Sequence, residues 1–254
     1  AVRTTGGVDI ADQSSQELSI NDAPVLADMP LALTVAEDAA APVGAVGSLL
    51  SSFTGGITDV NPGSVKGIAI VGTNETNGTW YYTTNNGATW TAVNQVDGTV
   101  SNSNALLLAD DANTRLYFSP NADYNGSDPA ALTLRAWDTT TGTAGTKVDP
   151  GGVGGALAFS TETDVIDVTV TPLADVPVNT VPGAQGTGIN MPLVFSAANG
   201  NALSVADSDG NIATARVTVT NGVANVTLVG GATISAGAIS RITTYIGRMS
   251  TKCR

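Results

Sequence analysis

The chain of 254 residues has no histidine, one cysteine and few charged residues, which make up 13% of it. Without histidine, a His-ligated zinc site, a serine triad and histidine acid–base catalysis are excluded. The single cysteine, Cys253, excludes an internal disulfide and any metal site built from several thiolates. The longest wholly apolar run, Ala105–Ala109, is far shorter than the roughly 20 residues of a membrane-spanning helix. The sequence therefore predicts no membrane insertion.

The charged residues that are present are mostly acidic, with 22 Asp and Glu against 10 Lys and Arg and a net charge of −12. Nucleic acid is an unsuitable partner, because its phosphates require basic side chains. Asp outnumbers Glu by 18 to 4. Short carboxylates are typical of turns and of cation sites built from oxygen ligands.

The C-terminal segment 239–254 has a different composition from the rest of the chain. It contains four basic residues and no acidic residue, whereas residues 1–240 carry a net charge of −16. We expect either an artificial end or change of reading frame, or a basic tail that docks on an acidic neighbour. Because the chain starts at Ala1 rather than Met, we also expect a processed chain or a piece of a longer protein.

The pattern of apolar residues predicts an all-β fold. Threonine, glycine and asparagine are abundant, a composition that favours strands joined by tight turns. No segment sustains a helical period, and turn residues recur every 8–15 residues, as in an antiparallel β-sandwich. The expected strands of the first domain are Leu31–Val35, Val43–Leu50, Gly67–Val71, Thr79–Thr83, Trp90–Val93, Arg115–Phe118, Leu132–Trp137 and Asp164–Thr171, the last with Val165, Val168 and Val170 as its apolar set.

Two proline-containing segments, Asn21–Pro24 and Ala174–Pro177, predict joints between domains. We therefore expect an arm or a neighbour's strand over 1–20, a β-sandwich over 21–177 and a second, incomplete β domain over 178–238, followed by the basic tail. The clearest signal in the second domain is a hairpin, with strands Ile212–Thr220 and Val223–Val229 around Asn221-Gly222.

Several motifs resemble the cadherin-like tandem repeats of giant bacterial surface adhesins and extracellular matrix proteins. They follow one another over residues 21–177 in the order that such repeats use. These motifs are Asn21–Leu26, Val35–Asp38, Thr58–Asn61, Asn77–Trp80, Phe118–Gly126 and Arg135–Asp138. The resemblance implies cadherin- or immunoglobulin-like sandwiches in tandem, stiffened by calcium.

Calcium binds six to eight oxygens from carboxylates, amide side chains and backbone carbonyls. The resemblance suggests that the first joint collects such ligands at one pole of the sandwich, from Asn21, Asp22, Glu37, Asp59, Asn61 and Asp138. In the second domain, the loop Asp207–Asn211 places side-chain oxygens of Asp207, Asp209 and Asn211 at alternate positions around a glycine, and Asp175 is a further candidate. The alternative is that each of these side chains only caps a turn.

Two other patterns suggest carbohydrate chemistry. Thr83–Trp90 resembles the Asp-box hairpin of sialidase propellers, which is a structural turn there, and Trp80 and Trp90 either pack on the core or stack on a sugar. Carboxylate pairs such as Asp110-Asp111, or Glu162 with Asp164, have the residue types of a glycosidase acid and base. A single box and chance pairs among 22 acidic residues do not predict an enzyme.

The sequence therefore predicts a non-catalytic, extracellular or cell-surface structural module. In the first hypothesis it is a calcium-stiffened spacer of a bacterial adhesin or biofilm matrix protein, in contact with neighbouring repeats. In the second, copies assemble into a filament when residues 1–20 of one copy add as a strand to an exposed sheet edge of another. A carbohydrate-binding module is a third alternative.

Overall fold

The computed structural model describes residues 20–61, 63–210, 212–218 and 250–253. The chain divides into two units, 1–172 and 173–254. Among the described residues the only helical segments are short 3-10 turns, η2 (Leu50–Phe53) and η3 (Ala197–Asn199), so the all-β prediction is confirmed. None of the described helices is long and apolar enough to cross a membrane. Most of the expected arm (1–20) and basic tail, and the turn of the Asn221-Gly222 hairpin, lie outside the described residues.

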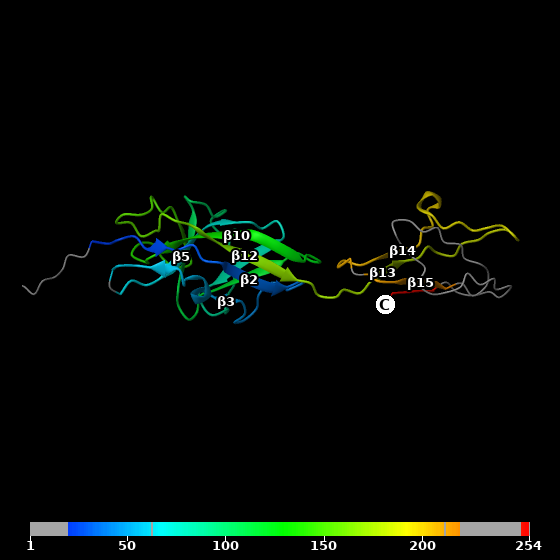
Figure 1. The fold of residues 1–254 in the computed structure, drawn as a ribbon, viewed down its shortest axis with the longest axis horizontal. Helices are drawn as coiled ribbons and strands as arrows, with labels where there is room; N and C mark the ends of the chain where they lie inside the picture. Colours follow the sequence, from blue (N-terminus) through cyan, green and yellow to red (C-terminus); the bar gives the residue numbers. More distant parts are fainter. Residues whose placement is uncertain (1–19, 62, 211, 219–249, 254) are drawn as a thin grey trace, which may run out of the picture. The chain divides into compact units, whose positions relative to one another are not determined.

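Unit 1 contains two main sheets and a small two-stranded ribbon (Figure 1). The six-stranded sheet consists, in spatial order, of β11 (Lys147–Val148), β8 (Ala105–Ala109), β5 (Gly67–Thr73), β10 (Gly126–Trp137), β12 (Asp164–Thr171) and β2 (Leu31–Ala36). The four-stranded sheet consists of β3 (Ser48–Leu49), β9 (Arg115–Pro120), β6 (Gly78–Thr83) and β7 (Thr91–Ala92). The ribbon pairs β1 (Val25–Leu26) with β4 (Ile57–Thr58).

The main core lies where side chains of the two sheets meet, an arrangement consistent with a β-sandwich. Ile68, Ile70, Leu132 and Leu134 come from the six-stranded sheet, and they belong to one buried cluster with residues of β6 and β9. Trp80 of β6 is fully buried, its ring packs edge-on against Phe118 with centroids 5.2 Å apart, and its Nε1 donates to the carbonyl of Ala131 at 2.9 Å. The expected packing of Trp80 on the core is thus confirmed.

Buried and exposed residues alternate strictly along β12: the even-numbered residues are buried and the odd-numbered residues are exposed. Ile166, Val168 and Val170 face the core, because side chains two apart in a strand share one face. The expected apolar set was wrong at Val165, which is 37% exposed, since it lies on the opposite face from Val168.

A second buried cluster covers the other face of the six-stranded sheet at β5 and β8. Leu107 of β8 packs there with Trp137, Ala158 and Phe159, while Leu106 and Leu108 face the main core. Because both faces of β8 are buried, its sequence is continuously apolar instead of alternating. For this reason, the apolar run Ala105–Ala109 was not predicted as a strand.

The segment expected as a strand over Val43–Leu50 is mostly irregular, and only Ser48 and Leu49 pair with β9. Gly44 and Gly47 adopt φ of +72° and +73°, which are incompatible with a strand. A Cβ on Gly47 would lie 2.4 Å from the carbonyl oxygen of Leu116, so this close approach requires glycine. The strands expected over Thr79–Thr83 and Trp90–Val93 are present as β6 and β7, and Tyr81 pairs with Ala92 between them.

The first and last strands of the six-stranded sheet run parallel, contrary to the purely antiparallel prediction. Leu31 pairs with Ile166 and Ala36 with Thr171, so β2 and β12 start at one end of unit 1 and finish at the other (Figure 1). We call these the entry end and the exit end. They lie roughly 23 Å apart along β12, at about 3.3 Å per residue. The chain therefore enters unit 1 at one end and leaves it at the other.

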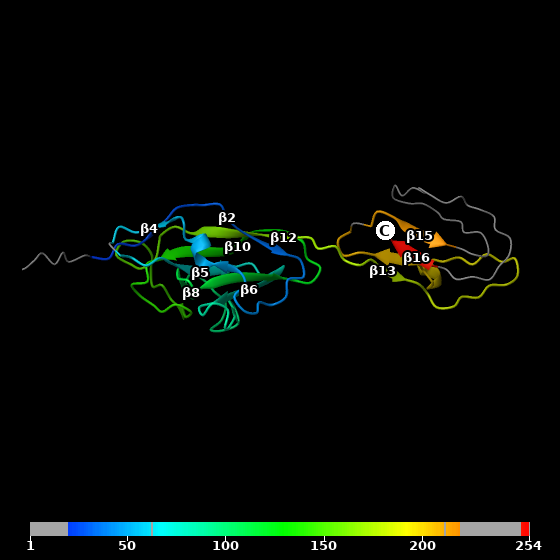
Figure 2. The same cartoon turned by 90° about the horizontal axis from the view of Figure 1, so that it is seen from below.

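In the described part of unit 2, β13 (Val178–Thr180) pairs with β14 (Ser204–Ala206), and β15 (Ala215–Thr218) pairs with β16 (Ser250–Cys253). Figure 2 shows β15 beside β16. Among the described residues of unit 2 whose burial is known, only Asn201 is buried. The described part of unit 2 therefore lacks an apolar core of its own.

Replacement of Trp80 tests the main core. Trp80→Phe leaves the buried carbonyl of Ala131 without its donor and opens a small cavity, so we expect the free energy of unfolding to fall by about 2 kcal/mol. Trp90→Phe is the matched control, because Trp90 is partly exposed and donates to the carbonyl of Gly44 at the surface. We expect a loss of about 1 kcal/mol or less there. Urea denaturation measures both, and equal losses would contradict this account of the core.

Candidate functional site

Five residues that the sequence predicts as calcium ligands are linked by hydrogen bonds at the entry end of unit 1. Asn21 donates from Nδ2 to Oδ2 of Asp138 at 2.8 Å, and the backbone N–H of Asp22 donates to Oδ1 of Asn61 at 2.8 Å. Oδ1 of Asp59 accepts from the backbone N–H of Asn61 at 2.7 Å. We call Asn21, Asp22, Asp59, Asn61 and Asp138 the entry cluster.

Three strand ends build the entry cluster. The segment before β1 supplies Asn21 and Asp22, the loop after β4 supplies Asp59 and Asn61, and Asp138 follows the last residue of β10. The β1–β4 pairing brings the first two segments together. Asp138 is only 3% exposed, and its Oδ1 also accepts from the backbone N–H and the hydroxyl of Thr140 at 2.8 and 2.6 Å. The fold therefore brings carboxylate and amide side chains from distant parts of the sequence to one end.

The carboxylates of the entry cluster are suited to a cation. Oδ2 of Asp59 is buried and has no hydrogen-bond partner in the described structure. The donors that reach Asp59 and Asp138 are amides, a hydroxyl and backbone N–H groups, which carry no net charge. A desolvated carboxylate oxygen without a partner is costly, and a divalent cation would compensate it.

Glu37 does not belong to the entry cluster, which corrects the expected grouping of ligands. Its backbone N–H donates to Thr171 at the exit end, and its Oε1 accepts from Nδ2 of Asn125 at 3.1 Å. Beside it, Oδ1 of Asp38 accepts from the backbone N–H of Asp123 at 3.1 Å, and carboxylate oxygens of these two residues lie within 4.8 Å of each other. We call Glu37, Asp38, Asp123 and Asn125 the exit cluster.

Three members of the exit cluster were not among the predicted ligands, although the motifs that carry the resemblance contain them. Only the fold shows that they lie at the exit end. The pairing of β10 with β12 places Gly126, next to Asn125, opposite Val170 near the end of β12. Asp128 of β10 lies in the same part of the strand and is 5% exposed, and it accepts from Asn77 at 2.6 Å. Burial, together with the nearby Asp128 carboxylate, raises the pKa of Tyr124 above its usual value. This end is therefore also acidic.

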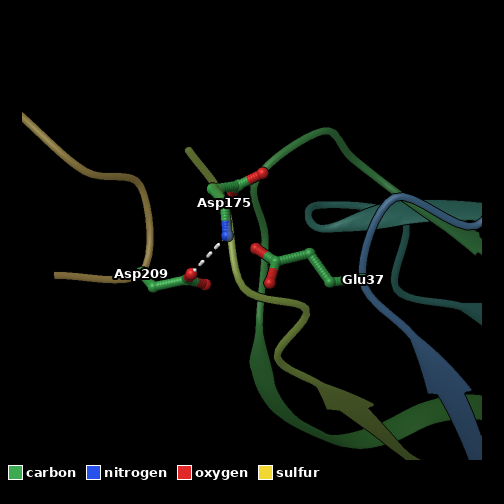
Figure 3. Close-up of side chains that lie close together, drawn as sticks. All are labelled: Glu37, Asp175 and Asp209. Atoms are coloured by element: carbon green, nitrogen blue, oxygen red, sulfur yellow. Dashed lines mark hydrogen bonds between the residues drawn. The ribbon is translucent and has the colours of Figure 1, made fainter. Parts of the chain in front are cut away.

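In unit 2, Asp175, Asp207 and Asp209 form a third group. The backbone N–H of Asp175 donates to Oδ2 of Asp209 at 2.8 Å (Figure 3), and Asp209 donates its own N–H to Oδ1 of Asp207 at 3.1 Å. Gly210 has a φ of +64°, which allows the loop to turn. Oδ2 of Asp207 is buried without a hydrogen-bond partner in the described structure, and Asn211 lies outside the described residues.

The residues that suggested carbohydrate chemistry have structural contacts. Asp110 accepts from the hydroxyl of Thr54 at 2.6 Å, Asp111 accepts from two backbone N–H groups of its own turn, and Asp164 accepts from the N–H of Met29 at 3.1 Å. Trp80 is buried and out of reach of a sugar, and Trp90 packs edge-on against Tyr117. These contacts give Asp110, Asp111, Asp164 and Trp80 a structural role in the fold.

Comparisons with protein-family models, with curated proteins and with solved structures found no match to this chain. The three acidic groups and the path of the chain through unit 1 are the features of the structure that bear on function.

Asn61→Ala tests how the entry cluster is held. Asn61 accepts from Asp22 and donates from Nδ2 to the carbonyl of Ile20 at 3.2 Å. Loss of both bonds should increase the hydrogen-exchange rate of the Asp22 amide about tenfold, while the core amide of Trp80 is unaffected. Asn74→Ala, in a remote exposed turn where Asn74 accepts from Thr76, is the control. An unchanged rate at Asp22 would show that Asn61 does not hold the entry segment.

Proposed function

We propose that this chain is a non-catalytic structural module of an extracellular or bacterial cell-surface protein, and that calcium binds at its acidic ends and stiffens it. The proposed context is an adhesin or a biofilm matrix protein, in which neighbouring repeats are the partners. The finer fold assignment, cadherin- or immunoglobulin-like sandwiches in tandem, is part of the same proposal and is supported by the ordered motifs over residues 21–177.

The observation that carries the proposal is the parallel pairing of β2 and β12, with oxygen ligands concentrated at the entry end. A domain that the chain enters at one end and leaves at the other adds length when it is placed in series. Parallel first and last strands produce this path, whereas antiparallel ones would return the chain to the end at which it entered. This is the requirement for a spacer.

The ligand chemistry supports calcium over transition metals. The entry cluster contains three carboxylates and two amide side chains, all with oxygen atoms that can bind a metal ion. The sequence has no histidine and one cysteine. Hard oxygen ligands in this number suit calcium, which binds flexibly through six to eight of them. Asp175, Asp207 and Asp209 are the proposed ligands in unit 2, with Asn211 as a fourth residue. A bound cation would also reduce the repulsion among the acidic groups.

The first test is unfolding with and without calcium. For a site with a Kd of about 0.1 mM, typical of extracellular modules, 10 mM calcium should raise the free energy of unfolding by about 2.7 kcal/mol. EGTA should reverse the rise. Urea denaturation of the full chain, followed by tryptophan fluorescence, measures this change, because the three tryptophans lie in unit 1.

Asp59→Asn identifies the entry cluster as the site. The amide oxygen can still accept from Asn61, so we expect the calcium-free fold to be retained while the charge at the unpartnered Oδ2 is lost. The variant should lose at least half of the calcium-dependent stabilisation. Asp97→Asn, at an exposed left-handed position in a loop, is the charge-matched control and should retain it. Equal responses of the two variants, or none in the parent chain, would exclude calcium binding by the entry cluster.

A further inference from the structure

The outer edge of β2 is free to pair with another strand. The backbone N–H of Glu37 donates to the carbonyl of Thr171, and the carbonyl of Val35 accepts from the hydroxyl of Thr171. The backbone N–H and C=O groups of the odd-numbered residues of β2 therefore point toward β12. Because N–H and C=O groups alternate sides along a strand, those of Ala32, Thr34 and Ala36 point away from β12. Among the described residues, β2 is the last strand of its sheet on this side.

This edge has none of the features that normally prevent strand addition. β2 is six residues long and contains no charged residue and no proline. The other edge strands of the two main sheets, β11, β3 and β7, have only two residues each. Proteins usually protect long edges with charges, prolines or bulges, and a long uncharged edge without them pairs readily with an added strand.

A groove of about 300 Å³ runs beside the β2 edge and gives an added strand somewhere to place its side chains. Leu33 and Val35 of β2 line one side, and Leu116 and Phe118 of β9 line the other. Leu116 and Phe118 are fully buried, and Leu33 is 7% exposed, so the floor of the groove is apolar. β3 pairs only with Arg115 and Leu116 of β9, which leaves the groove open beyond them.

We propose that the segment Val8–Ala11 of this chain docks as a strand on the free edge of β2. Nineteen residues precede Ile20, the first described residue, and Val8 and Ile10 are two apart, so both side chains would enter the groove while Asp9 faces solvent. Four extended residues span about 10 Å, which fits within the roughly 13 Å of β2 from Ala32 to Ala36. Main-chain pairing supplies affinity and the two apolar side chains supply register, as in β-strand addition generally.

The test uses a fluorescently labelled peptide of residues 1–19 and the chain lacking those residues. We expect saturable binding by fluorescence anisotropy, equal in calcium and in EGTA. Thr34→Pro removes an N–H that faces the free edge and spares the pairing with β12, so it should weaken binding about tenfold or more. Thr34→Val keeps this N–H and should bind as the parent does. Circular dichroism and the urea midpoint verify that both variants fold.

Peptide variants provide the matching test from the other side. Ile10→Lys should abolish binding, because it places a charge in the apolar groove, whereas Asp9→Asn should bind normally.

Light scattering of the full chain then distinguishes the two ways of docking. A mass that rises with concentration and falls on deletion of 1–19 indicates donation to a second copy. A constant monomer mass indicates docking within one chain. No binding, or binding that Thr34→Pro leaves unchanged, overturns the proposal. Because calcium is varied independently, this failure is distinguishable from failure of the calcium site.

Discussion

The parallel pairing of β2 with β12 is the constraint on which the organisation of unit 1 depends. It sets the direction of the chain through the sandwich and thereby defines an entry end and an exit end. It also places Asp138 at the entry end, because β10 runs antiparallel to β12 and finishes where β12 begins. The same pairing leaves β2 as an edge strand, so the path of the chain, the acidic ends and the free edge have a common origin.

The strands with regular alternation could be predicted from sequence, whereas their partners could not. β12 has the predicted bounds and β2 extends the predicted segment by one residue, because both alternate along the strand. β5 is buried on both faces, but it contains the β-branched residues Ile68, Ile70 and Val71 and extends the predicted segment by two residues. β8 was missed because burial on both faces removes the alternation and its residues are only Ala and Leu. The parallel direction of β2 was missed because strand direction depends on pairing between residues 135 positions apart, about which local patterns contain no information.

The candidate site was also predicted only in part, because local patterns do not show which strand ends lie together. The expected group of Asn21, Asp22, Asp59, Asn61 and Asp138 is linked by hydrogen bonds at one end of unit 1, because the strands bring their segments there. Glu37 was assigned to the wrong end, since its motif indicates a ligand type and not a position. The proximity of Asp38 and Asp123 was not predicted, because only the folded chain brings their carboxylates within 4.8 Å.

The account's central claim is that calcium binds the entry cluster, and tryptophan-sensitised terbium luminescence tests it most directly. Trp137 immediately precedes Asp138, so a terbium ion held by the entry cluster would lie close to an energy donor. We expect strong luminescence that calcium displaces and that Asp59→Asn abolishes, with Asp97→Asn unchanged. Luminescence that calcium does not displace, or that Asp59→Asn leaves intact, would contradict a calcium site in the entry cluster.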